Sequence, residues 1–265
     1  TRTMAPLVNN DAFKKALKIY KKTTEFGSAD ELNFDTNDVR YAFISGRCAL
    51  AIEWGDIGTM AVLPESKVKN KTGVSILPGA TEVLNRKTGQ LERCNANLCP
   101  FAIGDINYAP YAAFGGWVGS INNASSKHKK NLAYNYLSYV TQPLQSNEDV
   151  TIGATGMNPY RTSQLVNHKN WLKQGMSKST LHFYLGSISK TVNNANIILD
   201  LRIFENNRYF RDILDTEVAK YLRHTQTVDQ TVENIEAAWN KLTDEIGRDK
   251  QLKAYRASLG LVPTP

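Results

Sequence analysis

The 265-residue sequence lacks the motifs that identify the common classes of enzyme. Its histidines are few and isolated, and their spacing would not build a zinc site: His128, His168, His182 and His224. It contains neither a phosphate-cradling glycine loop nor a nucleophile elbow. Glu53 and Asp56 alone do not make an acid–base pair, because nothing in the sequence indicates that their pKa values differ in the way such a pair requires. We therefore expect a protein that is not an enzyme and that uses no cofactor or metal.

Cysteine is also scarce, and the three cysteines have different surroundings. Cys94 and Cys99 lie in a polar loop, at a spacing that can close a small disulfide ring, whereas Cys48 begins an apolar stretch and is expected to be a buried free thiol. Two glycosylation sequons, Asn70-Lys71-Thr72 and Asn123-Ala124-Ser125, add to the picture. Together these features favour a secreted, extracellular or periplasmic glycoprotein with a disulfide.

Long apolar runs are missing too, and none approaches the length that a membrane span needs. The excess of 32 basic over 25 acidic residues gives a net charge of +7, but the lysines are spread along helical faces and no nucleic-acid motif accompanies them. We interpret this charge as a solvated basic surface, with no nucleic-acid partner. Residues 1–8 are neither a translation start nor a signal peptide, so the chain is expected to be a fragment of a longer precursor.

Apolar periodicity predicts an α/β protein with many helices and few, short strands. One helix should be capped by Asn10 or Asp11, and a second should follow Asp35 or Thr36 and end at Gly46. Buried strands are predicted over 48–52, 74–77 and 118–121, and a long polar stretch over 80–111. A helix from about Ser126 should bury Leu132, Ala133, Tyr136, Leu137 and Val140.

The last third is predicted to be helical. One helix should turn Phe210, Val218, Tyr221 and their neighbours inward. The next opens with a capping box at 227–230, and its apolar stripe should face the core: Val232, Ile235, Trp239, Leu242 and Ile246.

The order of these parts resembles family 1 extracellular solute-binding proteins of sugar ABC transporters, the maltose and trehalose/maltose binders among them. The resemblance begins with the run Ala12–Trp54, which ends in "SGRCALAIEW". It continues through "GGWVGSINNASSKHKKNLAYNYLSYVTQP", "GATGMNPYRTSQL" and the terminal "AAWNKLTDEI". No single motif is strict, but the four segments follow one another in the family's order and span nearly the whole chain.

The resemblance implies a helix-rich α/β fold of the type II periplasmic-binding-protein kind that is incomplete, with the N-terminal lobe largely missing. Residues 1–113 and 190–265 would belong to the C-terminal lobe, and 114–189 would be a crossing segment that contributes to the other lobe. The missing N-terminal half would come from the same precursor or from a separate chain. A membrane transporter or a larger assembly would be a further partner.

By the same resemblance, a sugar-like ligand would lie in a cleft between the lobes. Indole rings stack on the apolar faces of sugars, while carboxylates and guanidinium groups bind their hydroxyls. The residues that match the family's cleft positions come from three segments: Glu53, Trp54 and Asp56; Gly116 and Trp117; Tyr160 and Arg161. Other roles are open to them, because tryptophan usually packs in cores, Arg161 could cap a helix, and Glu53 and Asp56 could cap the following turn.

Two readings of function follow. The first is non-enzymatic capture of a small polar solute, a sugar or oligosaccharide. The second is a structural or interaction module, such as a receptor ectodomain, that reuses the fold without transport. The chain departs from the sugar binders in having Glu53-Trp54-Gly55-Asp56 in place of a proline-containing turn, and in the long 80–111 insertion.

Overall fold

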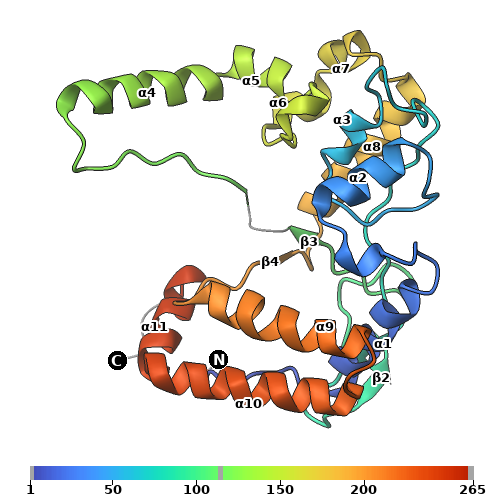
Figure 1. Cartoon of the computed structure of the whole chain (residues 1–265), viewed down its shortest axis with the longest axis vertical. Helices are drawn as coiled ribbons and strands as arrows, with labels where there is room; N and C mark the ends of the chain where they lie inside the picture. Colours follow the sequence, from blue (N-terminus) through green and yellow to red (C-terminus); the bar gives the residue numbers. More distant parts are fainter. Residues whose placement is uncertain (1–2, 113–115, 262–265) are drawn as a thin grey trace. The chain divides into compact units, whose positions relative to one another are not determined.

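The computed structural model describes residues 3–112 and 116–261, which group into two compact units (Figure 1). Unit 1 comprises 1–33, 79–107 and 200–265, and unit 2 comprises 34–78 and 108–199. The division expected from the sequence differs in placing 34–78 with the segments of unit 1. The expected crossing point at 113–114 lies outside the described residues. Which lobe of a binding protein each segment represents stays a prediction.

Unit 1 is a helical body with one small hairpin. Its core joins Leu17, Tyr221, Leu222 and Val232 from three helices. Figure 1 shows α9 and α10 side by side, in agreement with their packing. The helical elements are α1 (Asp11–Thr23), a 3₁₀ turn (Glu31–Asn33), a π-helical stretch (Arg208–Asp215), α9 (Thr216–Leu222), α10 (Val228–Ile246) and α11 (Arg248–Ser258).

Local sequence signals set the helix ends in unit 1 as expected. The side chain of Asn10 accepts a hydrogen bond from the amide of Phe13 and caps α1. The predicted capping box of α10 is confirmed, because Thr227 accepts from the amide of Gln230 and Gln230 accepts in return from the amide of Thr227. The apolar stripe of α10 is buried at Val232, Ile235 and Leu242.

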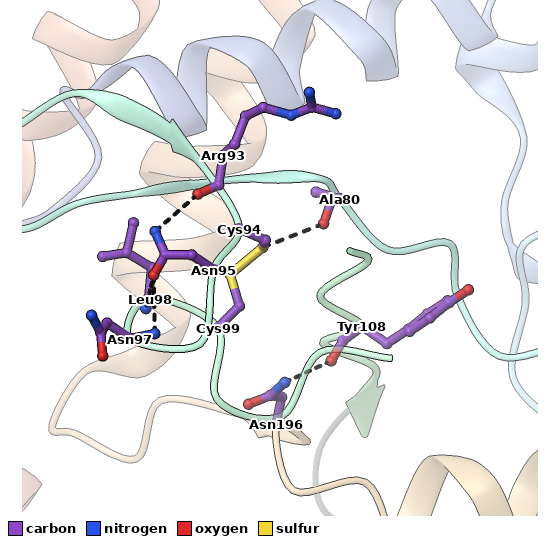
Figure 2. Close-up of a disulfide and its surroundings, with 9 residues drawn as sticks. All are labelled: Ala80, Arg93, Cys94, Asn95, Asn97, Leu98, Cys99, Tyr108 and Asn196. Atoms are coloured by element: carbon purple, nitrogen blue, oxygen red, sulfur yellow. Dashed lines mark hydrogen bonds between the residues drawn. A yellow bond between two sulfur atoms is a disulfide. The ribbon is translucent and has the colours of Figure 1, made fainter. Parts of the chain in front are cut away.

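The polar 80–107 region of unit 1 folds around an antiparallel hairpin and a disulfide. Strand β1 (Glu82–Leu84) pairs with β2 (Leu91–Arg93). The predicted disulfide is present and joins Cys94 to Cys99, in a small loop whose turn is closed by the Asn95 side chain (Figure 2). An ion pair of 2.6 Å between Lys15 and Glu82 ties this region to α1.

Removing the disulfide is expected to cost unit 1 only modest stability. A cross-link over so short a loop restricts the unfolded chain weakly, and the expected loss for the Cys94→Ser/Cys99→Ser variant is about 2 kcal/mol in the free energy of unfolding. Urea unfolding of the two proteins, with Cys48→Ser as the control for thiol removal, measures it. A loss as small as that of the Cys48→Ser control would show that the ring contributes nothing.

Unit 2 is helical, and its core includes Val62, Val150, Trp171 and Tyr184. The predicted cap of α2 is confirmed, since Asp35 accepts from the amides of Asn37 and Asp38. The helices are α2 (Thr36–Ile44), α3 (Ile57–Met60), α4 (Lys127–Thr141), α5 (Pro143–Asp149), α6 (Thr162–Val166), α7 (Lys169–Lys173) and α8 (Lys178–Val192), with a 3₁₀ turn at Gly153–Thr155.

The sheet expected in unit 2 is almost absent from the described residues. Strand β3 (Tyr111–Ala112) pairs in parallel with β4 (Ile198–Leu199), and the ladder extends no further. The segments 48–52, 74–77 and 118–121 do not form strands in the structure and belong to neither of its sheets. Residues 49–52 and 118–120 are exposed, and Cys48 is free but only half-buried. The prediction of paired, buried strands is therefore wrong within this chain, because a strand is buried only when others flank it.

Helix α4 also departs from the prediction. It begins after Ser126, as expected, but none of its residues is buried. Leu132 and Tyr136, which were expected to face a core, are largely exposed. Among the described residues, no helix is both long and apolar enough to cross a membrane.

Candidate ligand-binding site

Two of the three predicted site segments meet on unit 2. The turn that contains Gly55 lies against Asn158, so closely that a β-carbon on Gly55 would fall 2.5 Å from the Asn158 side-chain oxygen. Asn158 Nδ2 reaches Oδ1 of Asp56 at 3.5 Å. Gly156, which has a left-handed backbone with φ of 62°, approaches the same carboxylate. Segments 53–56 and 156–161, about a hundred residues apart in sequence, are thus neighbours.

A buried arginine organises the first segment. Arg40 projects from α2, and its Nε and Nη2 donate to Oε1 of Glu53 at 3.2 and 3.1 Å. Nη2 also donates to Oδ1 of Asp56 at 3.0 Å. It forms an ion pair with Oδ2 at 2.8 Å, although Oδ2 accepts no hydrogen bond among the described residues. The exposed side-chain fractions are 12% for Arg40, 9% for Glu53 and 1% for Asp56. Each carboxylate is therefore compensated, as buried charges must be.

This cluster also positions Trp54. The Arg40 guanidinium lies 5.7 Å from the centre of the indole ring, and the backbone amide of Trp54 donates to Glu53 Oε1 at 2.9 Å. The indole remains 39% exposed, so Trp54 is held in place but is not a core residue. A ring in this state can stack on a flat apolar face of a ligand.

Tyr184 of α8 packs against α3, close to Asp56 of the Arg40–Glu53–Asp56 cluster. A β-carbon on Gly58 would fall 2.5 Å from the Tyr184 ring, which shows how closely α3 and α8 approach. The Tyr184 hydroxyl is buried and has no hydrogen-bond partner among the described residues. Burial, and secondarily the negative charge of Asp56, raise the pKa of Tyr184, so the hydroxyl stays protonated. The Tyr184 hydroxyl is thus a neutral polar group close to the Asp56 carboxylate.

The second segment is held by one buried glutamine. Gln164 Oε1 accepts from the backbone amides of Tyr160 and Arg161 at 2.8 and 3.0 Å. Its Nε2 donates to the carbonyl of Ser146 on α5 at 3.2 Å. Tyr160 is 54% exposed above this anchor, with the Arg161 guanidinium 5.4 Å from its ring. The loop thus presents an exposed phenol from a rigid base.

Arg161 has the capping contact that the sequence left open as an alternative. Its Nη2 donates to the carbonyl of Thr141, the last residue of α4, while Nε is buried without a partner among the described residues. A guanidinium at a helix C-terminus satisfies a carbonyl that has no partner within the helix. Arg161 therefore positions Tyr160 and α4 in this structure, and its contact with a ligand stays a prediction.

The third predicted segment is Gly116 and Trp117. Gly116 has φ of 101°, a conformation that favours glycine, and Trp117 is highly exposed. Their part in a ligand site stays a prediction. Sequence analysis had also missed Arg40, Asn158, Gln164 and Tyr184.

The candidate site combines aromatic, ionic and amide side chains. In the described ranges, no group of three or more histidine, cysteine, aspartate or glutamate side chains could hold a metal ion. Two surface hollows of unit 2 are lined by other residues, one by His168 and Lys178 among others and one by Glu148 and Lys173 among others.

The fold of this chain matches a solved structure, although its sequence matches no family model. No protein-family model matches the sequence, and no curated protein does. Among solved structures, the chain is similar to maltose-bound MalE3 of T. maritima, with a TM-score of 0.67 and 17% identity over 91% of this chain. The match covers 53% of MalE3, so this chain spans about half the length of that protein. The likeness shows that the chain shares the fold of the matched part of MalE3, a protein whose structure was solved with maltose bound.

Proposed function

We propose that this chain takes part in the non-enzymatic capture of a small polar solute, a sugar or oligosaccharide. The observation that carries the proposal is the structural likeness to a maltose-bound protein over nine-tenths of the chain. The meeting of segments 53–56 and 156–161 on unit 2 supports it independently, because it assembles half-exposed rings beside ionic groups.

In this proposal the aromatic rings bind the apolar faces of the solute. Trp54 and Tyr160 stack on sugar rings, and the charged edge of the Arg40–Glu53 pair accepts and donates hydrogen bonds to hydroxyls. Asp56 is only 1% exposed, so it acts through Arg40 and does not contact the solute directly. Gly116 and Trp117 supply a hinge and a third aromatic group when the lobes close.

The opposite wall of the cleft would come from a polypeptide absent from this structure. Solute sites in proteins are concave and enclose most of the ligand. We propose that this chain forms one part of a two-lobed binder in an ABC transport system, and that the solute stabilises the closed form through its higher affinity for it. In the proposed lobe assignment, 1–113 and 190–265 belong to the C-terminal lobe, and 114–189 contributes to the other.

The compartment we propose is extracellular, cell-surface or periplasmic. The Cys94–Cys99 disulfide supports it, because such bonds persist in oxidising compartments. Of the two sequons, only Asn123 is open to glycosylation without loss of backbone contacts, since the Asn70 side chain bonds the backbone of Gly175 and Ser177 at 3.0 and 2.8 Å.

Alanine at Trp54 or at Tyr160 is expected to weaken solute binding about tenfold or more, because each removes one stacking face. Calorimetric titration of maltose, maltotriose and other sugars into the protein as purified from its source measures this. Phe26→Ala is the matched control, because Phe26 is an exposed aromatic residue of unit 1 and its loss should leave the affinity unchanged. An unchanged affinity in both Trp54→Ala and Tyr160→Ala would rule out this site.

The second candidate function is a structural or interaction module. The observation in its favour is the exposed apolar sequence of residues 49–52 and 118–121. Native mass spectrometry separates the two, because a bound small mass and sugar binding are expected only for solute capture. An empty chain that binds no sugar but holds a second polypeptide would favour the module.

A further inference from the structure

Two segments of unit 2 have the sequence expected of strands but are exposed, apart from the half-buried Ile121. The first is 49–52, Ala-Leu-Ala-Ile, and the second is 118–121, Val-Gly-Ser-Ile; we call them the open strands. Leu50 is 90% exposed, Ile52 75% and Val118 94%. Scattered apolar residues are normal on a protein surface, but an unbroken run of four such as 49–52 is not.

The backbone of the open strands is unpaired as well. Within residues 3–112 and 116–261, no hydrogen bond is made by the main-chain groups of 49–52 or of 118–121. Helices α2 and α4 flank them in sequence, so each open strand belongs to an αβ or βα pair without a sheet. Unpaired main-chain donors and acceptors in an extended apolar segment form a template on which another strand can add.

Helix α4 also has apolar side chains that no other described element covers. Gly119 of the second open strand lies against Leu137 of α4, where a β-carbon would fall 2.6 Å from the leucine side chain. Other apolar side chains of α4 remain largely exposed, among them Leu132 at 56% and Tyr136 at 66%, whereas Ala133 and Val140 are half-buried. The second open strand therefore covers α4 at one point, and the exposed apolar side chains of α4 could pack against further strands.

The nature of the missing cover follows from the pattern and from the comparison. Residues 49–52 are apolar on both faces, a pattern typical of parallel strands buried between two layers of helices, whereas 118–121 includes Gly119 and Ser120. The matched protein is about twice as long as this chain, so nearly half of its fold has no counterpart here.

We propose that residues 49–52 and 118–121 are sites of strand addition, where a second polypeptide segment pairs its main chain with this one and covers α4. The occupant is a separate polypeptide that carries the strand-bearing part of the solute-binding fold that this chain does not contain. Main-chain hydrogen bonds would give the affinity, and the apolar side chains of the open strands would become core. The proposal rests on the fold and not on solute capture, so the experiments that test it need no ligand.

Amide hydrogen exchange followed by mass spectrometry tests the proposal. The chain alone and the protein purified from its source are compared at 49–52 and 118–121. We expect rapid exchange in the isolated chain and exchange slowed about tenfold or more in the native form. Rapid exchange at both segments in the native form would overturn the proposal. Protection in the isolated chain together with a doubled mass would assign the surface to a second copy and would also overturn it.

Charged substitutions test the same surface through association. Leu50→Asp and Val118→Asp should weaken the native association about tenfold or more, because each would bury an unpaired carboxylate in the interface. The isolated chain should unfold at an unchanged urea midpoint, because both side chains are exposed in it. Phe26→Asp is the matched control, since Phe26 is 82% exposed but lies in unit 1. An association that is equally strong in all three variants would contradict the proposal.

Discussion

Replacement of Arg40 by alanine is expected to destabilise unit 2 by about 3–5 kcal/mol. The guanidinium compensates two carboxylates, at least one of which is almost completely buried: Asp56 is 1% exposed and Glu53 9%. Without Arg40 both charges would remain in a medium of low polarity with no cation beside them. The cost of a buried charge without a partner, and not the small net value of the ion pair, explains the size of the effect.

Urea unfolding of Arg40→Ala measures the loss, with Arg208→Ala as the matched control. Arg208 pairs with Glu245 at 3.3 Å, but both side chains are about half exposed, so its removal should cost less than ~1 kcal/mol. Lysine at position 40 should recover part of the stability, because it restores the charge but cannot bridge both carboxylates. A loss in Arg40→Ala no larger than that in Arg208→Ala would show that the cluster is solvated.

The same variant links stability to the proposed site. Trp54 is held by the Arg40 guanidinium and by its own amide bond to Glu53. In Arg40→Ala the indole should become more mobile and more exposed, which a red shift of the tryptophan emission would report. Any solute affinity carried by Trp54 should fall with it.

Alanine in place of Trp171 is also expected to cost about 3–5 kcal/mol in the free energy of unfolding. Trp171 is 1% exposed and packs edge-on against Tyr184, with ring centres 5.5 Å apart. Its Nε1 donates to the carbonyl of Gln164 at 3.0 Å. The substitution leaves a large cavity and a buried carbonyl without its donor, and both effects destabilise the same unit.

Two further variants separate these contributions. Trp171→Phe keeps most of the ring volume and loses the hydrogen bond, so we expect an intermediate loss of about 1–3 kcal/mol. Trp117→Ala in the isolated chain is the control for tryptophan removal, since Trp117 is 87% exposed and should contribute within about 0.5 kcal/mol. Equal effects of Trp171→Ala and Trp117→Ala would contradict the core that the structure places around Trp171.

Trp171 also acts on the candidate site through Gln164. The glutamine accepts from the amides of Tyr160 and Arg161, so disorder around Trp171 should reach the loop that presents the phenol. Hydrogen exchange at 160–161 should accelerate in Trp171→Ala but not in Trp117→Ala. This result would identify Gln164 as the residue that couples the core to the site.

The features that the sequence predicted correctly are local ones. The caps at Asn10 and Asp35 and the capping box at Thr227 each depend on hydrogen bonds between residues two or three positions apart. The Cys94–Cys99 ring spans five positions. Such interactions can be read from a short window, because the chain geometry within it is nearly determined by the helix or turn that the residues form.

The candidate site was predicted only in part, because its contacts are not local. The sequence placed Trp54 and Tyr160 among the ligand-facing residues, but it contained no sign that segments 53–56 and 156–161 would meet. Arg40 and Gln164 were missed, although they position these residues, because an arginine or glutamine on a helix is usually a surface residue. The burial of such a side chain can be recognised only in the folded structure, where residues of other elements surround it.

The sequence by itself determined the caps of α1, α2 and α10, the disulfide, the buried stripe of α10 and a resemblance to solute-binding proteins. Only the tertiary structure decided which charges meet around Arg40, and that residues 49–52 and 118–121 stay unpaired. The physical reason is the range of the interactions. A helix satisfies its main chain within four residues, whereas a strand and a buried charge both depend on partners that are distant in sequence or lie on another polypeptide.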